Sequence, residues 1–330
     1  MSTRPLQIAV GLAFFALVLG VSPASAGKPE CKAINQSQDA TYSSKHHTDP
    51  LGTAIAEAQP GDTIKVIGTC HGNFGIDKDL TLTGRKSAHH EDTIDGDGSG
   101  EVLFNTANGI DWIVRNLTVT GGTTGIHNAN ATLSVTSAHV TGNTGSGILN
   151  GGVTTVEGSF VSENDSDSGG GIFNGGALTI NNSAVTNNTA ADMGGGIWSR
   201  FPFTVSNSVI QGNTAGAHGG GILAGTGADI LNTVIDGNTA GLDGGGIHNV
   251  DLADTDLTNS IVRNNVASRG GGIFTSAAFA PLALTDSVVT ANTATVSGGG
   301  IFCSGGATIA LHGTSIVFGN DPDDVSGCSP

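Results

Sequence analysis

The chain is poor in basic residues, proline and aromatic side chains. Its 330 residues include 12 Lys and Arg, nine Pro, one Tyr, two Trp and twelve Phe. Because 28 residues are acidic, the formal net charge is −16, and so few cations cannot build the basic surface that nucleic acid or an anionic membrane requires. A hydrophobic content of 37% and the low proline count also exclude a collagen and a largely disordered chain.

Only one long apolar run is present, and it lies at the N-terminus. Arg4 precedes an apolar run at 8–21, and the small residues Ala24-Ser25-Ala26 follow it. This order is typical of a secretory signal peptide (residues 1–26), with cleavage predicted after Ala26. The run is short for a bilayer span, so we expect a secreted, extracellular protein without a transmembrane segment in its mature chain.

Cysteine is rare, and the four residues lie in two groups near the ends of the exported part. Three pairings are formally possible. The grouping favours Cys31–Cys70 and Cys303–Cys328, each of which would fasten one end of the chain in an oxidising compartment. No C-x-x-C pair of a zinc site is present.

Glycine, in contrast, is abundant, with 53 residues, and much of it is periodic. Six triple-Gly runs, each followed by Ile, begin at Gly169, Gly194, Gly219, Gly244, Gly270 and Gly298. A second register places a β-branched residue three positions before Asn143, Asn164, Asn188, Asn213, Asn238, Asn265, Asn292 and Asn320. Repeats of about 25 residues indicate a stacked-repeat architecture.

The content of each repeat favours β-structure. Short β-rich runs alternate with Gly, Asn, Ser and Thr, without helical periodicity. Three short strands in about 25 residues fit one coil of a parallel β-helix, whose coils are spaced by about 4.8 Å. We therefore predict an all-β fold of about ten coils over residues 63–320. A cap at 27–62 would include a short helix at 50–58 over the first coil, and a second cap would follow at 321–330.

The repeated positions have distinct physical roles in such a coil. The Ile after each Gly run and the β-branched residue before each Asn should point inward and stack. The Gly run allows a tight corner in which a Cβ would clash. The Asn column should form an internal ladder, and a Ser/Thr column five residues earlier should form a second polar stack.

The repeats resemble those of a known group of proteins. The GGGI-x-N units with their V-x-x-N partners resemble the Gly-rich repeats of secreted bacterial right-handed parallel β-helix proteins. They are also similar to the GGAI and FxxN repeats of chlamydial polymorphic outer-membrane proteins. Ala54-Ile-Ala-Glu-Ala58 and Gly61-Asp-Thr-Ile64 look like the first coil of pectin-lyase-like β-helices. Over residues 50–328 the resemblance implies a single-stranded right-handed parallel β-helix, a fold that hosts lyases, hydrolases, adhesins and structural spikes.

One outward-facing column is rich in aromatic residues. The residue after each inward Ile should face out, and in β-helix polysaccharide enzymes this sheet floors the substrate groove. The column reads His127, Leu149, Phe173, Trp198, Leu223, His248, Phe274 and Phe302, with Arg200 close to Trp198. We therefore expect His127, Phe173, Trp198, Arg200, His248, Phe274 and Phe302 to bind carbohydrate. Alternatively, neighbouring side chains cover the column, or its residues serve as good strand formers.

A second column, just before the Gly runs, carries charge. His218, Asp243 and Arg269 should lie on successive coils, with Asp192 nearby. His218 with Asp243 could act as the base of a polysaccharide lyase, with a cation or Ca²⁺ neutralising a uronate. Asp192 with Asp243 could act as the carboxylate pair of a glycoside hydrolase. The alternative is an exposed turn with ordinary polar residues.

Signals for a metal are weak. Asp95-Gly-Asp97-Gly-Ser99-Gly100 resembles the start of an EF-hand loop, but its twelfth position is Thr106, so a Gly-rich turn is the better interpretation and Ca²⁺ stays open. Five His fall in the N-terminal region, without metal-site spacing: His46, His47, His71, His89 and His90.

Three functional hypotheses remain. The first is a secreted β-helix that binds a polysaccharide or a cell-surface component through the aromatic column, and not nucleic acid. The second is a polysaccharide lyase or glycoside hydrolase. The third is a structural rod of the cell envelope.

Overall fold

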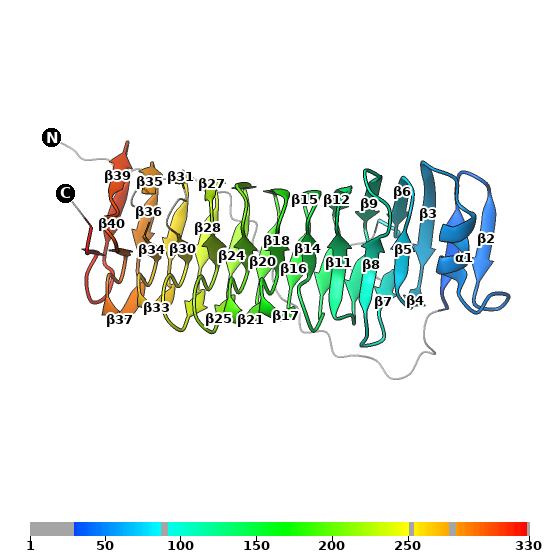
Figure 1. The fold of residues 1–330 in the computed structure, drawn as a ribbon, viewed down its shortest axis with the longest axis horizontal. Coiled ribbons are helices and arrows are strands. Elements are labelled where there is room, and N and C mark those ends of the chain that lie inside the picture. Colours follow the sequence, from blue (N-terminus) through cyan, green and yellow to red (C-terminus); the bar gives the residue numbers. More distant parts are fainter. Residues whose placement is uncertain (1–29, 87–91, 251–253, 277–281, 329–330) are drawn as a thin grey trace.

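The computed structural model describes residues 30–86, 92–250, 254–276 and 282–328. In this part the chain forms one elongated stack of coils with a single helix at its N-terminal end (Figure 1). The predicted signal peptide and the two histidines His89 and His90 lie outside the described residues. No helix in the described part is long and apolar enough to cross a membrane.

Four sheets run along the stack. Sheet A contains, in spatial order, β2 (Ala40–Ser43), β1 (Lys32–Asn35), β3 (Asp62–Ile67), β6 (Leu80–Thr83), β9 (Asp111–Arg115), β12 (Thr132–Thr136), β15 (Val153–Glu157), β19 (Ala177–Asn181), β23 (Phe203–Ser206), β27 (Gly227–Leu231), β31 (Asp254–Thr258), β35 (Leu282–Thr285) and β39 (Ile309–His312). Sheet B contains β4 (Thr69–His71), β7 (Thr93–Asp95), β10 (Thr118–Thr120), β13 (His139–Thr141), β16 (Phe160–Ser162), β20 (Ala184–Thr186), β24 (Val209–Gln211), β28 (Val234–Asp236), β32 (Ile261–Arg263), β36 (Val288–Thr290) and β40 (Ile316–Phe318).

The other two sheets complete each coil. Sheet C contains β5 (Phe74–Ile76), β8 (Glu101–Asn105), β11 (Thr124–Asn128), β14 (Ile148–Asn150), β18 (Ile172–Asn174), β22 (Ile197–Ser199), β26 (Ile222–Ala224), β30 (Ile247–Asn249), β34 (Ile273–Thr275), β38 (Ile301–Cys303) and β41 (Val325–Ser326). Sheet D, at the corner between sheets B and C, contains β17 (Asp165–Ser168), β21 (Thr189–Met193), β25 (Thr214–Ala215), β29 (Thr239–Ala240), β33 (Val266–Arg269) and β37 (Thr293–Ser297).

The chain visits sheets A, B and C in turn and then starts the next coil, so each strand pairs with its equivalent about 25 residues away. Apart from the antiparallel hairpin that β1 makes with β2 and its antiparallel contact with β3, the paired strands are parallel. Crossovers between parallel strands of one sheet are right-handed. The prediction of a right-handed parallel β-helix of about ten coils is thereby confirmed.

The apolar columns fill the interior as the sequence predicts. The Ile residues that follow the Gly corners have no exposed surface: Ile126, Ile148, Ile172, Ile197, Ile222, Ile247, Ile273 and Ile301. Glycine is required at these corners because backbone segments of the next coil approach the corner closely. A Cβ on Gly220 would lie 2.4 Å from the carbonyl oxygen of Thr239 and 2.5 Å from that of Gly245, closer than any side chain permits.

Two polar ladders run through the interior beside the apolar columns. The Nδ2 of Asn188 donates to the Oδ1 of Asn213 at 3.0 Å, and that of Asn213 donates to the Oδ1 of Asn238 at 3.0 Å. In the second ladder, the backbone N–H of Ser159 donates to the Oγ of Ser183 at 3.1 Å. Each ladder satisfies buried turn groups from one coil to the next, as the sequence predicts.

The N-terminal end is closed by the hairpin β1–β2 and by α1 (Pro50–Glu57). The side chain of Asp49 accepts a hydrogen bond from the backbone N–H of Gly52 and so caps the start of α1, while Leu51 and Ala54 are fully buried beneath it. This helix is the one predicted for residues 50–58. The predicted disulfides are also present: Cys31–Cys70 and Cys303–Cys328.

Candidate functional site

The outward column of sheet C is assembled by strand register. Parallel pairing places His127 beside Leu149, and Phe173 beside Trp198, on adjacent coils. The same register continues through Leu223, His248, Phe274 and Phe302. Toward the N-terminus it adds Phe104, which the sequence alone did not single out because its coil lacks the Gly-Gly-Gly-Ile signature, and then Gly75.

The column is not uniformly exposed, which corrects the expectation of a solvent-facing stripe along the whole sheet. Leu223, His248 and Phe274 retain only 5–6% of their surface. The side chain of His218 packs on His248 with ring centroids 4.8 Å apart, and Arg269 lies 5.2 Å from the centroid of Phe274. Side chains from the sheet D corner therefore cover the middle of the column. Its N-terminal part and Phe302 stay half-buried.

An aromatic cluster with a cation lies in the accessible part of the column. The rings of Phe173 and Trp198 pack edge to face with centroids 4.6 Å apart. The guanidinium of Arg200, which is exposed, lies 4.8 Å from the Trp198 ring and 5.3 Å from the Phe173 ring. A Cβ on Gly194, whose φ is +65°, would come within 2.5 Å of the Cβ of Trp198, so the corner glycine lets this side chain sit against the turn. We call Phe173, Trp198 and Arg200 the aromatic–arginine cluster.

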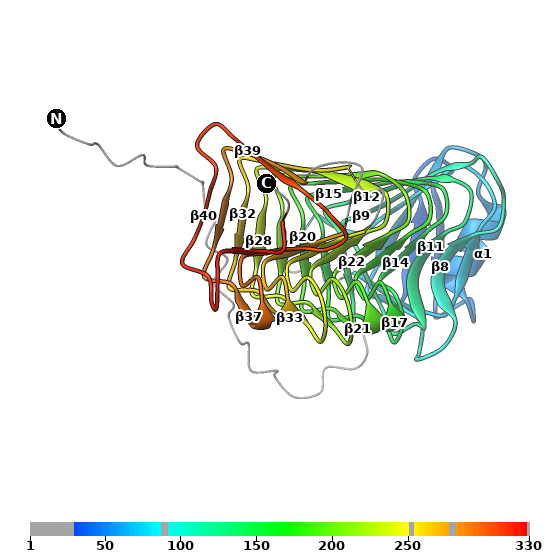
Figure 2. The same ribbon diagram turned by 60° about the vertical axis from the view of Figure 1, so that its left-hand side comes forward.

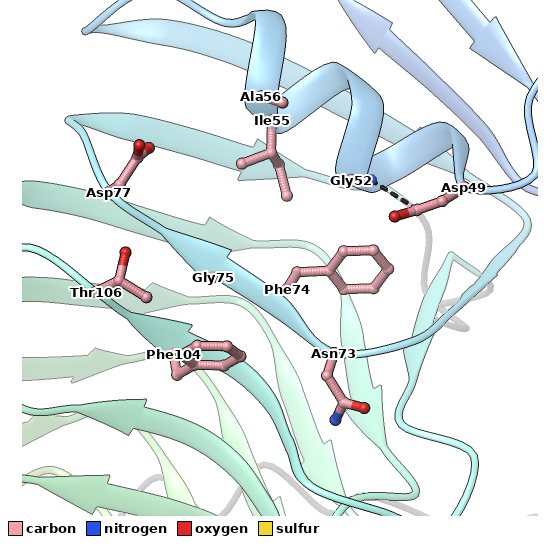
Figure 3. Close-up of a pocket in the computed structure, with 10 residues that line it drawn as sticks. All are labelled: Asp49, Gly52, Ile55, Ala56, Asn73, Phe74, Gly75, Asp77, Phe104 and Thr106. Carbon is pink, nitrogen blue, oxygen red and sulfur yellow. Dashed lines mark hydrogen bonds between the residues drawn. The ribbon is translucent and has the colours of Figure 1, made fainter.

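The N-terminal end of the face leads into a hollow of about 350 Å³ between α1 and sheet C (Figure 3). Phe104 and Phe74 form apolar walls, and Asn73, Asp77 and Thr106 add polar groups around them. Here Gly75 occupies the outward position that carries a side chain on the later coils. Between the hollow and Phe173, the Nδ1 of His127 lies 2.7 Å from the Oε1 of Glu101.

The three charged residues predicted at the sheet D corner do come together. The backbone of His218 pairs with that of Asp243 on the next coil, and the backbone of Asp243 pairs with that of Arg269 on the coil after it. Arg269 donates from Nε to Asp243 Oδ1 at 2.8 Å and from Nη2 to Oδ2 at 2.9 Å. The Nδ1 of His218 lies 3.4 Å from Asp243 Oδ2. The carboxylate of Asp243 is nearly buried and engaged on both oxygens.

This arrangement favours one catalytic hypothesis over the other. A hydrolase would need Asp192 and Asp243 as two available carboxylates. Asp192 is exposed on β21, but both carboxylate oxygens of Asp243 accept hydrogen bonds from Arg269, so Asp243 is not an available carboxylate. A lyase needs a single base, for which His218 is the candidate. Its buried Nδ1 approaches Asp243 but makes no hydrogen bond to it.

A second polar group lies at the end of β4 and β7 on sheet B. It contains His71, Asp95 and Asp97, each of which has one ligand atom within 4.8 Å of those of the other two. The Nδ1 of His71 is 2.7 Å from the Oδ1 of Asp97. Asp95 ends β7, and the residues from there to Gly100 form a Gly-rich turn, as the sequence favours. Ca²⁺ takes six to eight oxygen ligands. One half-buried carboxylate, one exposed carboxylate and one imidazole therefore do not fit a resident Ca²⁺ ion.

Comparisons with known proteins bear on the fold. No protein-family profile and no curated protein matches this sequence. Two solved structures are similar: an alginate lyase from Paenibacillus sp. strain FPU-7, and pectate lyase Pel9A. The first is 18% identical with a TM-score of 0.48 and covers 84% of this chain and 96% of its own. The second is 13% identical with a TM-score of 0.47 and covers 81% and 73%.

Proposed function

We propose that this protein is a secreted, non-catalytic β-helix that binds polysaccharide along the outer face of sheet C, from the hollow at Phe104 to the aromatic–arginine cluster. The cluster carries the proposal. Within the described residues, Arg200 has no carboxylate partner, whereas Arg263 and Arg269 each pair with an aspartate. An unpaired, exposed arginine on two half-buried rings, in a chain with a net charge of −16, is a group available to a ligand.

The chemistry of the face suits a sugar. The part of the Phe173 and Trp198 rings that stays exposed beside Arg200 offers apolar area for the C–H side of a pyranose, with little conformational entropy to lose. The five N–H donors of Arg200 can reach hydroxyl or carboxylate oxygens. Ligand sites typically combine apolar surface with a few polar groups that fix the orientation of the ligand, as this face does.

The face also has the length for a polymer. Four coil spacings separate Phe104 from Trp198, about 19 Å at about 4.8 Å each. Beyond Trp198 the column is buried from Leu223 to Phe274. Of the predicted ligand contacts, His248 and Phe274 are therefore covered, and Phe302 lies beyond them at the far end of the column. A polysaccharide would lie on the N-terminal half of the face.

The test is a glycan-array screen followed by calorimetric titration of the best oligosaccharide. Trp198→Ala should weaken binding about tenfold or more, the equivalent of about 1.4 kcal/mol. Phe302→Ala, an aromatic truncation on the same sheet outside the binding half, is the matched control and should bind like the wild type. An empty array, or wild-type affinity in Trp198→Ala, refutes the proposal.

A second candidate is a polysaccharide lyase, favoured by the contact between His218 and the Arg269-held carboxylate of Asp243. In this hypothesis the Nε2 of His218 removes the C5 proton of a uronate, the C4–O4 glycosidic bond breaks as a C4=C5 double bond forms, and the leaving oxygen takes a proton from water. Incubation with uronic acid polymers, with absorbance of unsaturated products as the readout, decides between the two. Turnover that disappears in His218→Ala would establish a lyase, whereas a structural rod of the cell envelope would show neither binding nor turnover.

A further inference from the structure

The outer face of sheet B carries two metal-ligating side chains near the N-terminal end of the stack. β4 and β7 pair in parallel, and their register places His71 beside Asp95. The preceding residue of each strand, Cys70 or Ile94, is almost fully buried in the core. Because side chains alternate along a strand, His71 and Asp95 both point outward and lie next to each other.

The turn after β7 adds a third such side chain. This turn leads from sheet B to sheet C, at the corner where later coils carry sheet D, whose strands follow one edge of the stack in Figure 2. Asp97 lies in the turn between two glycines and has a φ of +53°, a left-handed conformation that Asp adopts more readily than most residues. The chain thereby brings the Oδ1 of Asp97 to 2.7 Å from the Nδ1 of His71.

Asp95 contributes one oxygen to the turn and one to the cluster. Its Oδ1 accepts a hydrogen bond from the backbone N–H of Asp97 at 2.9 Å. Its Oδ2 lies 3.8 Å from the Nδ1 of His71. Among the described residues, these three form the one group of at least three His, Cys, Asp or Glu side chains whose ligand atoms all lie within 4.8 Å of one another.

The distances in the cluster suit a small transition-metal ion. Zn²⁺ binds a histidine nitrogen at about 2.0–2.1 Å and a carboxylate oxygen at about 2.0–2.2 Å, so two ligands of a tetrahedral ion lie about 3.3 Å apart. The distances from the Nδ1 of His71 to Asp97 and Asp95, 2.7 and 3.8 Å, lie on either side of this value. Small rotations of the side chains therefore suffice to place all three ligand atoms around one ion.

Charge and exposure suit the same kind of ion. Two carboxylates and a neutral imidazole carry a charge of −2, which a divalent cation neutralises, and the chain as a whole has a formal charge of −16. The imidazole favours Zn²⁺ over Ca²⁺ and Mg²⁺, which prefer oxygen ligands. The side chains of His71 and Asp95 are each 30% exposed and that of Asp97 is 57% exposed, so an ion can enter from solvent and keep a water ligand.

We propose that His71, Asp95 and Asp97 bind a divalent transition-metal ion, with Zn²⁺ as the reference ion. The protein ligands are the Nδ1 of His71, the Oδ2 of Asp95 and the Oδ1 of Asp97, and water completes the tetrahedron. No short metal motif identifies this site in the sequence, because the ligands come from adjacent coils and His71 is 26 residues from Asp97.

The ion would link two coils beside the hollow. Asn73, which lines the hollow, follows His71 by two residues. Its Nδ2 donates to the backbone oxygens of Ser99 and Glu101, both at 2.8 Å, and so joins the hollow to the turn that carries Asp97. An ion that binds only the folded coils should raise the melting temperature.

Isothermal titration calorimetry of the chelator-treated protein with Zn²⁺ tests the proposal. We expect one ion per chain, and His71→Ala and Asp97→Asn should each raise the dissociation constant tenfold or more. Asn tolerates the left-handed backbone at position 97, and far-UV circular dichroism checks the fold of each variant. The double variant His46→Asn/His47→Asn is the control, because two adjacent imidazoles outside the cluster could also hold an ion; it should bind Zn²⁺ like the wild type.

Two further measurements identify the ligands. Zinc X-ray absorption should show one imidazole nitrogen and oxygen ligands at about 2.0–2.2 Å. Zn²⁺ should also raise the melting temperature of the wild type and the control but not that of Asp97→Asn at the same concentration. Absence of Zn²⁺ binding, wild-type affinity in either cluster variant, loss of binding in the control, or a spectrum with two or more imidazoles would overturn the proposal.

Discussion

Removal of one rung of the asparagine ladder should destabilise the whole stack. Asn213 has no exposed surface and takes part in four side-chain hydrogen bonds. Its Oδ1 accepts from the N–H and the Nδ2 of Asn188, at 2.9 and 3.0 Å, and its Nδ2 donates to Val185 O and Asn238 Oδ1, at 2.9 and 3.0 Å. Asn213→Ala therefore leaves two buried donors of Asn188 without an acceptor.

The magnitude follows from those two donors. Each buried polar group without a partner costs about 1–3 kcal/mol, so with two such donors the variant should lose about 2–6 kcal/mol of unfolding free energy. Asn320→Ala should lose less, because Asn320 lies at the end of the ladder, where water can replace its bonds.

Urea denaturation followed by circular dichroism measures the effect, with the slope of the transition checked for constancy. Asn181→Ala, on the outer face of sheet A, is the control; it removes one partly exposed hydrogen bond from Ser206 and should cost less than about 1.5 kcal/mol. If Asn213→Ala were as stable as this control, the ladder would not be a buried network and the argument would fail.

Three further perturbations test the core, an ion pair and a terminal disulfide. Ile222→Ala should cost about 2–5 kcal/mol in urea denaturation, because the fully buried side chain leaves a cavity; near-zero loss contradicts inward stacking. Burial alone would raise the pKa of Asp92, but the hydrogen bonds from Arg85 and the backbone lower it overall. The ionised Asp92 therefore stabilises the fold above about pH 4, and this contribution is lost as the pH falls through the folded-state pKa. The difference in unfolding free energy between the wild type and Asp92→Asn should shrink in acid. A difference that does not depend on pH would exclude this linkage. Replacement of both Cys303 and Cys328 by Ser should cost about 3 kcal/mol, since their separation is 25 residues; wild-type stability would show that the crosslink constrains little.

The regular part of the fold was predictable because its physics repeats. Each coil must bury one Ile after the corner and must satisfy its turn with an Asn, and those requirements appear in the sequence at a fixed period. The need for glycine at Gly194 and Gly220 was also predictable, since a Cβ has no room at these tight corners. The two disulfides followed from the position of the four cysteines at the ends of the stack.

The exposure of the candidate site residues was less predictable, because it depends on where long side chains from adjacent coils lie. The sequence placed Phe274 on the outward column, but its burial comes from Arg269 at the neighbouring corner. Phe104 was missed because its coil departs from the repeat, and the signal that identifies it is its register with His127. The hollow beside Phe104 exists only through the packing of α1, which no periodicity encodes.

Tryptophan fluorescence gives the most direct test of the sheet C binding face, because the chain has only two tryptophans. Trp112 is 1% exposed in the core, whereas Trp198 is half-buried on the proposed face. Titration with the oligosaccharide selected on the array should change the emission in a saturable way and protect Trp198 from iodide quenching, and Trp198→Phe should abolish the change. Binding without any change in emission, or with the same change in Trp198→Phe, would contradict the account.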